Sequence, residues 1–293
     1  MNHHDEIIKQ RLLDVLRFAI DLFKEHHITY YAAYGTAIGA VRHHGFIPWD
    51  DDIDLYVPRA DYERLMTLTH SYSHPDYDLL TYNMPGYYRP FIKISDRHST
   101  IWEYPKYHYP VGINIDIFPL DFFGHDKEWF LARGHQLKIT FRRSMIDHCS
   151  LALAGDAPWK EKLVRFVKYP RDLKEDLLRM VHKKHYYHDL FVRMEQEHAS
   201  FSGPHAGCFY EQKMHLLEAE WFGPGEEVPF EGIPLMLPKD NDAILRAIFG
   251  DYMQLPPEEQ RKSGHHRLYV NLNHRVPMSD ILQKTAQGIT LEE

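Results

Sequence analysis

The feature that most constrains this chain is an acidic cluster that opens an apolar run. Four aspartates lie within residues 50–54, and residues 53–57 are apolar enough to form a strand. Because alternate side chains of a strand share a face, we expect Asp52 and Asp54 to point the same way. Two unit charges about 4 Å apart repel by roughly 4 kcal/mol at an effective dielectric near 20. A fold with this pair needs positive charge beside it.

A third acid lies in a second strand pattern, at residues 111–118. Its apolar face carries Ile113, Ile115 and Ile117, and the opposite face carries Asn114 and Asp116. This alternation predicts a half-buried strand that presents an acid. If the strand neighbours the one at residues 53–57, Asp116 lies beside Asp52 and Asp54.

Three carboxylates of this kind favour a hard divalent cation, Mg²⁺ with Mn²⁺ as an alternative, over zinc, which prefers His or Cys. Such a cation binds phosphate oxygens. Aspartates taken alone are more typical of a solvated turn, where they cap helices and accept local hydrogen bonds. The order of the elements favours the catalytic interpretation: a strand, the turn Gly35-Thr36, a helix, and then the two acid-bearing strands.

The remaining pattern predicts an α+β or mixed α/β fold, with a small mixed sheet flanked by helices. A helical stripe at residues 5–27 comprises Ile8, Leu12, Leu16, Ala19 and Phe23. Further strands are expected at 29–34, 77–82, 88–95, 228–230 and 233–237, and further helices at 37–43, 59–70 and 240–249. The strand order cannot be read from the sequence.

We expect one domain over residues 1–293. Its parts would be a catalytic core at 28–122 with the packing helix 5–27, a helical region at 126–220, and a closing segment at 221–285. The 293 residues are 44% hydrophobic, which is ample for a core. No role is assigned to the helical region.

Composition excludes several classes of protein. The formal charge of -8 is spread along the chain, so a nucleic-acid binder is not expected. Two cysteines, Cys149 and Cys208, supply neither a zinc ribbon nor a disulfide framework. Neither a signal peptide nor an 18-residue apolar stretch is found, which indicates a cytoplasmic protein, with transient association at the inner membrane face left open. The oligomeric state is open.

Three stretches resemble one family. GTAIGAVRHHGFIPWDDDIDLYVPRADYERL and GINIDIFPLD closely resemble the LicD family of the nucleotidyltransferase-fold superfamily, and FEGIPLMLPKDNDAILRAIFGDYMQLPPEEQR resembles its closing segment. The family includes bacterial phosphocholine transferases and the fukutin-related ribitol-phosphate transferases. The resemblance covers roughly residues 28–122 and 221–266.

The resemblance implies transfer of a substituted phosphate, of the phosphocholine, phosphoethanolamine or alditol phosphate type. The donor would be CDP-linked, and the acceptor a sugar hydroxyl of a cell-surface glycan or glycolipid such as lipopolysaccharide or teichoic acid. It assigns Gly35 and Thr36 to the turn near the donor phosphates, and Asp52, Asp54 and Asp116 to the metal. Asp116 is also placed to accept the proton of the acceptor hydroxyl. Which group is transferred, and to which glycan, stays open.

Three cationic residues are candidates to bind the negatively charged phosphates. Arg42 lies inside the long motif. Lys93 lies in a strand pattern, where a solvated face is an equal alternative, and Arg89 is expected to be structural. Supporting roles are assigned to Phe46 and Trp49 as lining or core, to Asp50 and Asp51 as supports of the ligands or turn caps, and to Asp121 as a turn cap. Residues 251–252 and 261–266 are candidates to close over the site, although that role is not favoured.

Two other functions remain open. The same acids would serve a nucleotidyltransferase acting on a small acceptor, which would release pyrophosphate in place of CMP. A non-catalytic binding module of the same fold is the third possibility, although it gives no reason to retain three repelling acids. The sequence shows neither a nucleotide-binding P-loop, nor a G-x-G-x-x-G turn, nor an H-E-x-x-H helix.

Overall fold

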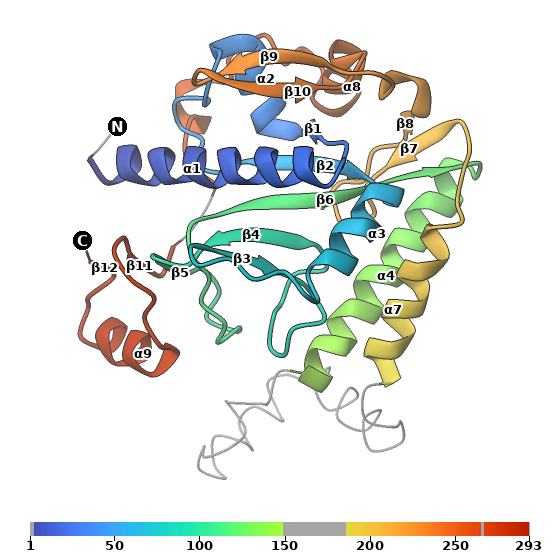
Figure 1. Cartoon of the computed structure of the whole chain (residues 1–293). Helices are drawn as coiled ribbons and strands as arrows, with labels where there is room; N and C mark the ends of the chain where they lie inside the picture. The colour runs from blue at the N-terminus through green and yellow to red at the C-terminus, as the bar shows by residue number, and fades with distance from the viewer. Residues whose placement is uncertain (1–2, 149–185, 265–266, 293) are drawn as a thin grey trace.

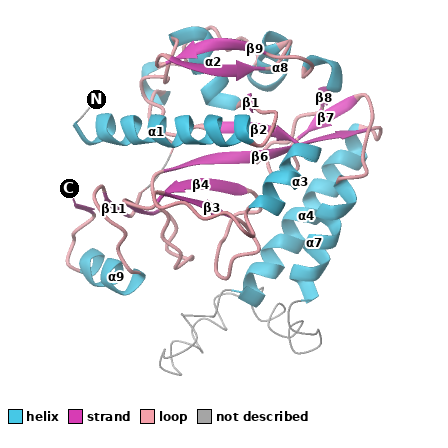
Figure 2. Cartoon of the chain, in the orientation of Figure 1, coloured by secondary structure: helices cyan, strands magenta, loops and turns pink. Residues whose placement is uncertain are grey.

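The computed structural model describes residues 3–148, 186–264 and 267–292, and it confirms the α+β class. A mixed sheet lies at the centre with helices packed around it, as Figures 1 and 2 show.

The main sheet contains strands from most of the chain. They are β1 (Tyr31–Ala32), β2 (Asp54–Pro58), β3 (Tyr77–Leu80), β4 (Ile92–Asp96), β6 (Asn114–Phe123), β7 (His205–Gly207) and β8 (Leu217–Glu218). Five of these strands follow the order β1-β2-β6-β4-β3, β7 pairs with the far end of β6, and β8 pairs with β7. The β2–β6 pair is parallel and the other pairs are antiparallel. The acid-bearing strands are therefore neighbours.

One face of the sheet is covered by α1 (His3–Glu25) and α3 (Arg59–Leu68). The predicted stripe of α1 is confirmed, because each of its five residues is at most 4% exposed. Leu55, Ile115 and Ile117 meet it from the sheet and are fully buried. Burial of a large aliphatic side chain stabilises the fold by about 1.5–3 kcal/mol. The stripe therefore anchors α1 to the acid-bearing strands.

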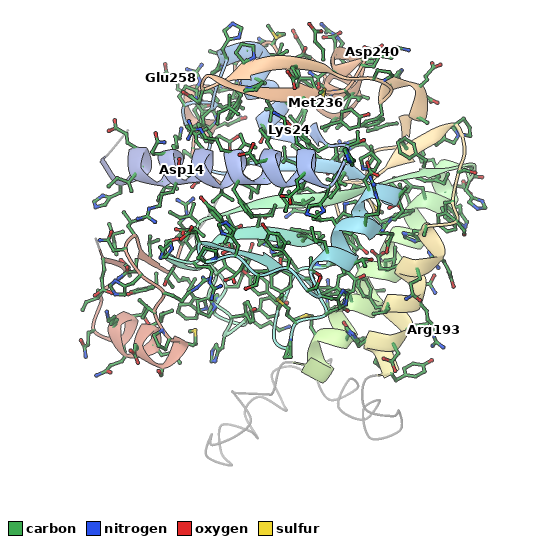
Figure 3. The ribbon with its side chains drawn as sticks, viewed as in Figure 1. Asp14, Lys24, Arg193, Met236, Asp240 and Glu258 are labelled. Carbon is green, nitrogen blue, oxygen red and sulfur yellow. The ribbon has the colours of Figure 1, made fainter. Side chains whose placement is uncertain are left out.

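A second group of elements lies beyond the β1 edge of the sheet. It comprises α2 (Tyr34–His43), β9 (Glu226–Phe230), β10 (Ile233–Leu237), the short helix η1 (Ala219–Trp221) and α8 (Asn241–Phe249). The β9–β10 hairpin confirms the two expected strands. Its turn residues Glu231 and Gly232 have φ of 49° and 77°, which match a two-residue turn with both φ positive. Met236 of β10, labelled in Figure 3, packs partly buried against the core.

Two long helices, α4 (Lys127–His148) and α7 (Tyr186–His198), pack side by side against the sheet (Figure 1). They agree with the helical expectation for residues 126–220. Residues 205–218 differ, because they add β7 and β8 to the sheet. The expected helices within 149–185 lie outside the described residues. The proposed division of the domain stays a prediction.

A small C-terminal sheet was not predicted. It joins β5 (Thr100–Trp102), β11 (Tyr269–Asn271) and β12 (Leu291–Glu292), with the short helix η2 (Glu258–Gln260) before it and α9 (Met278–Ala286) beside it. Strands this short give little periodic signal. Among the helices that the structure describes, none combines the length and apolarity that crossing a bilayer requires.

Candidate active site

The acids that are distant in sequence meet on one face of the sheet. Asp54 of β2 lies opposite Asp116 of β6, and Lys93 of β4 lies opposite Asp116 from the other side. The backbone N–H of Asp116 donates to the carbonyl of Ile53 at 2.9 Å, which fixes this register. The predicted alternation is confirmed, since Ile113, directly before β6, and Ile115 and Ile117 within it are fully buried, while Asp116 and Asn114 are only half-buried.

Asp52 is placed differently from the sequence-based argument. Strand β2 begins at Asp54, so Asp52 lies in the preceding loop and strand alternation does not apply to it. The backbone N–H of Asp54 donates to the side chain of Thr36 at 2.9 Å, which is where the sheet pairing stops. Asp52 nevertheless acts electrostatically on Asp54.

The acid cluster carries a surplus of negative charge. Burial, and then the charges of Asp52, Asp116 and Asp50, raise the pKa of Asp54 well above its ordinary value, and Lys93 lowers it only in part. The carboxylate of Asp54 is therefore destabilised as an anion. A cation at the cluster would relieve this repulsion.

Lys93 supplies part of that positive charge. Its side chain is 4% exposed, and its ammonium donates to Asp116 Oδ1 at 2.5 Å and to Asn114 Oδ1 at 2.6 Å. The solvated strand face considered for Lys93 is therefore wrong, because the lysine is buried among the acids. Among the largest electrostatic effects on Asp54, Lys93 is the one cation beside the carboxylates of Asp52, Asp116 and Asp50. Lys9 interacts with Asp50, and Arg89 with Asp116. A role of Lys93 toward phosphate stays a prediction.

The donor set is chemically suited to a hard divalent cation, because it consists of carboxylates in surplus over positive charge. Within the part of the chain that the structure describes, however, no three Asp, Glu, His or Cys side chains are arranged as a ready metal-ligand group. The assignment of Asp52, Asp54 and Asp116 to a metal stays a prediction, and it requires their side chains to converge.

The turn Gly35-Thr36 lies against the acids, as the sequence led us to expect. A Cβ on Gly35 would lie 2.5 Å from Asp50 Oδ2, so only glycine fits beside that carboxylate as it is placed. Thr36 accepts the N–H of Asp54, and the N–H of Ala33 donates to the carbonyl of Asp54 at 2.9 Å. Gly35 and Thr36 differ from the expected turn before a helix at 37–43, because they lie in the first turn of α2 itself. Thr36 and the residue that precedes α2, Ala33, hold the two backbone groups of Asp54. A phosphate-binding role for Gly35 and Thr36 stays a prediction.

Arg42 connects α2 to the closing segment. Its guanidinium donates to the carbonyl of Tyr252 at 2.5 Å, and its Nε is buried without a hydrogen-bond partner. This contact places residues 251–252 beside α2. The expected phosphate-binding role of Arg42 stays a prediction.

Arg89 is held on aromatic rings. Its guanidinium lies 4.7 Å from the ring centre of Tyr104 and 5.3 Å from that of Tyr88, and it donates to the Tyr104 hydroxyl at 2.7 Å. Burial opposes the charge of Arg89, but Asp116 and neighbouring groups raise its pKa. The Arg89 guanidinium, although it is held by aromatic rings, therefore also interacts electrostatically with Asp116.

The C-terminal tail reaches the acidic loop. Arg267 contacts Asp51 Oδ2 at 2.7 Å, and the hydroxyl of Ser263 donates to Asp51 Oδ1 at 2.8 Å. Arg261 lies 5.7 Å from a ring centre of Trp49. Asp51 therefore ties the loop to the tail. His265 and His266 lie outside the described residues.

One group of buried charges was missed by the sequence analysis. Arg59 donates to both carboxylate oxygens of Asp121, at 2.7 and 2.8 Å, and to Glu195 at 3.1 Å. The expectation that Asp121 caps a turn is wrong, because it lies fully buried within β6 and pairs with Arg59. His198 also contacts this group. An isolated arginine directly after a strand was the only available signal, and its partners lie far away in sequence.

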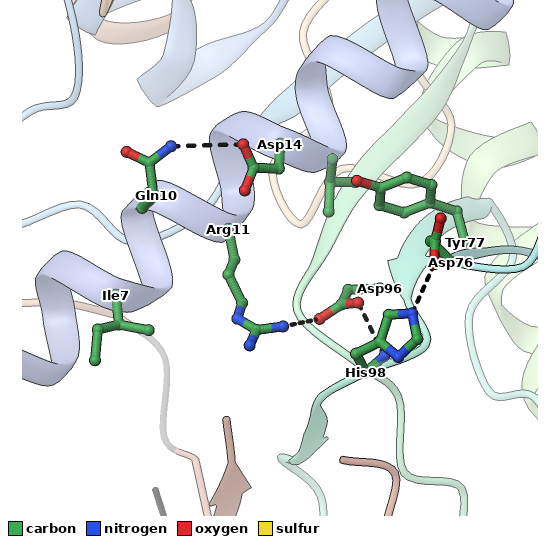
Figure 4. A pocket seen from close by; sticks show the side chains of 9 residues that line it. Ile7, Gln10, Arg11, Asp14, Asp76, Tyr77, Asp96 and His98 are labelled. Atoms are coloured by element: carbon green, nitrogen blue, oxygen red, sulfur yellow. Dashed lines mark hydrogen bonds and ion pairs between the residues drawn. The ribbon is translucent and has the colours of Figure 1, made fainter. Parts of the chain in front are cut away.

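A cavity of about 450 Å³ lies away from the acids, between α1 and the ends of β3 and β4 (Figure 4). Its polar lining is largely paired with itself: Arg11 contacts Asp96 at 2.9 Å, and His98 contacts Asp76 at 2.8 Å. Asp52, Asp54 and Asp116 do not line it. We assign it no part in the chemistry of the acids.

Comparison with known proteins gives one matching family domain and three similar proteins. Residues 27–157 match the LicD/FKTN/FKRP nucleotidyltransferase domain. The lipopolysaccharide cholinephosphotransferase LicD of Haemophilus influenzae is 28% identical over 270 residues, which cover 86% of this chain and 92% of the relative. The uncharacterized proteins RP689 of Rickettsia prowazekii and RT0683 of Rickettsia typhi are each 38% identical over 50 residues, which cover 17% of this chain and 19% and 16% of those proteins.

Proposed function

Because the chain carries a LicD-family nucleotidyltransferase domain, we propose that it transfers a substituted phosphate from a CDP-linked donor to a sugar hydroxyl of a glycan. The observation that carries the proposal is the parallel register that sets Asp54 beside Asp116, with the charge of Asp52 acting on the same place. Repelling carboxylates are expected where a cation and phosphates bind.

Asp52, Asp54 and Asp116 would hold the cation, Mg²⁺ or Mn²⁺. When bound, it would neutralise phosphate oxygens and offset charge that develops during transfer. Gly35, Thr36 and the start of α2 would face the donor phosphates, since N–H groups at a helix start favour anions. In this proposal the chain's own residues would define where the donor binds.

The reaction is an in-line displacement at the phosphorus that bears the substituent. The oxygen of the acceptor hydroxyl forms a new bond to that phosphorus, the bond to CMP breaks, and CMP leaves with the electron pair. Asp116 accepts the proton of the hydroxyl. Lys93, bonded to Asp116 Oδ1, holds this carboxylate in place.

Phosphocholine is the first group to test, because the Haemophilus influenzae relative is called a cholinephosphotransferase that acts on lipopolysaccharide. The purified protein should be incubated with Mg²⁺, a lipopolysaccharide acceptor and a panel of CDP-choline, CDP-ethanolamine and CDP-alditols. CMP release together with a modified acceptor supports the proposal.

Matched variants sharpen this experiment. Asp54→Asn and Asp116→Asn should abolish turnover while the proteins stay folded, whereas Asp14→Asn, on the exposed side of α1, should not. Full activity of Asp116→Asn would refute the proposal. Pyrophosphate release would point to nucleotidyl transfer, and failure to bind Mg²⁺ with a nucleotide would point to a binding module.

A further inference from the structure

Tyr34 has a backbone conformation that needs support. Its φ is 44°, in the left-handed region that residues other than glycine seldom adopt. It starts α2 and directly precedes Gly35 of the turn. Such a conformation persists only when surrounding contacts hold it.

The support comes from a distant carboxylate. Glu211, between β7 and β8, accepts hydrogen bonds at one oxygen from the hydroxyls of Tyr34 at 2.6 Å and Tyr56 at 2.7 Å. Its side chain is 5% exposed, and its other oxygen accepts the backbone N–H of His215 at 3.2 Å. Burial raises the pKa of both tyrosines well above 10, so both remain hydrogen-bond donors.

The two tyrosines differ in what else fixes them. Tyr56 lies within β2, where pairing with β1 and β6 sets its backbone. Tyr34 lies between the two residues that bind the backbone of Asp54: Ala33, which donates to its carbonyl, and Thr36, which accepts its N–H. A shift of Tyr34 therefore moves both of those bonds.

We propose that Glu211 is a positioning residue: through the Tyr34 hydroxyl it holds the strained turn that fixes the backbone of Asp54. The expected effect of Glu211 on catalysis rests on the proposed function. The hydrogen bonds of the Glu211 carboxylate join it to Tyr34, Tyr56 and His215, and of these three residues Tyr34 is the one at the start of α2.

The test compares Tyr34→Phe with Tyr56→Phe, which each delete one hydroxyl bonded to the same oxygen. Hydrogen exchange at the Asp54 amide is measured without donor, and kcat and KM are measured with the CDP-linked donor. Tyr34→Phe should speed the exchange and lower kcat about tenfold with little change in KM, whereas Tyr56→Phe should keep kcat within about twofold. Equal effects of both variants on exchange and on kcat would overturn the proposal.

A rescue experiment adds a second line of evidence. Glu211→Ala should also speed exchange at Asp54, and adding Tyr34→Asn should restore part of the protection, because asparagine tolerates the left-handed region. A double variant no better protected than Glu211→Ala contradicts the proposal. Hydrogen exchange tests the positioning role independently of the proposed reaction. If the protein turns over none of the CDP-linked donors but the exchange rates change as expected, the proposed function fails and the positioning of Asp54 by Glu211 stands.

Discussion

The buried pair of Arg59 and Asp121 allows a quantitative prediction for Asp121→Asn. Both groups are at least 95% buried, and two short bonds join them. The asparagine would keep one acceptor, but its amide NH₂ would face a guanidinium N–H. One charge-assisted bond is lost, and the positive charge of Arg59 loses its closest counter-charge.

The magnitude follows from burial. A hydrogen bond to a charged group contributes about 1.5–3 kcal/mol, and removing one partner of a buried ion pair costs about 3–5 kcal/mol. Arg59 retains Glu195 and Glu63, each at 3.1 Å, which places the expected loss near the lower end, about 3 kcal/mol. This is a large fraction of the roughly 5–15 kcal/mol that stabilises a domain.

Urea unfolding at neutral pH, followed by circular dichroism, measures this loss. The matched control is Asp14→Asn, because Asp14 contacts Arg17 at 2.8 Å with both side chains about half exposed. A pair of that kind contributes at most about 1 kcal/mol. If Asp121→Asn lowers the free energy of unfolding no more than the control does, the buried pair does not stabilise the fold as argued.

The pH dependence has a definite sign. Burial opposes ionisation of Asp121, but the charge and hydrogen bonds of Arg59, with a contribution from His198, lower its pKa overall. A lowered folded-state pKa gives stability that is present above the unfolded value, about 3.9, and is lost as pH falls through the folded value. The difference between the wild type and Asp121→Asn should therefore shrink below about pH 4. A difference that grows with acid would refute this reasoning.

Three further predictions concern the acids and α1. Gly35→Ala should reduce transfer while changing stability by less than about 1 kcal/mol, because the added Cβ displaces only the flexible carboxylate of Asp50; activity assays and urea unfolding check both parts. Leu16→Ala should lower the unfolding free energy by about 2–5 kcal/mol, since Leu16 lies fully buried in the apolar stripe of α1. Lys93→Met should destabilise the protein by about 1–3 kcal/mol, because Asp116 loses its ammonium partner, and Mg²⁺ should raise its melting temperature more than NaCl of equal ionic strength does.

The sequence predicted secondary structure correctly wherever apolar residues recur with a regular spacing along a short segment. The stripe of α1, the alternation of β6 and the strands at 228–230 and 233–237 are each set by neighbours within a few residues, and each is confirmed. Asp116 was expected beside Asp54 on the condition that their strands are neighbours, and the β2–β6 pairing meets that condition. Strand order did not follow, since pairing partners lie far apart in the chain.

Long-range pairing explains what the sequence could not predict. Arg59 meets Asp121 and Glu195 across 62 and 136 positions, and no periodic pattern links such residues. Glu211 reaches Tyr34 across 177 positions in the same way. The placement of Asp52 in a strand was wrong for a different reason. The acid–apolar–acid alternation is typical of a strand, but the backbone N–H of Asp54 donates to the hydroxyl of Thr36, and the strand pairing ends there.

Stability and cation affinity should be linked at the acid face. The fold holds Asp54 close to Asp116 through the β2–β6 register, and it buries the ammonium of Lys93 beside Asp116. Two carboxylates repel by roughly 4 kcal/mol when they are about 4 Å apart at an effective dielectric near 20, and Lys93 and the rest of the fold must offset this repulsion. A divalent cation that binds only the folded state would stabilise it by about 2.7 kcal/mol when the free cation concentration is a hundred times its Kd. Asp54→Asn should therefore stabilise the protein without Mg²⁺ and lose the stabilisation that Mg²⁺ gives, and a variant destabilised in both conditions would show that the carboxylates do not repel each other as argued.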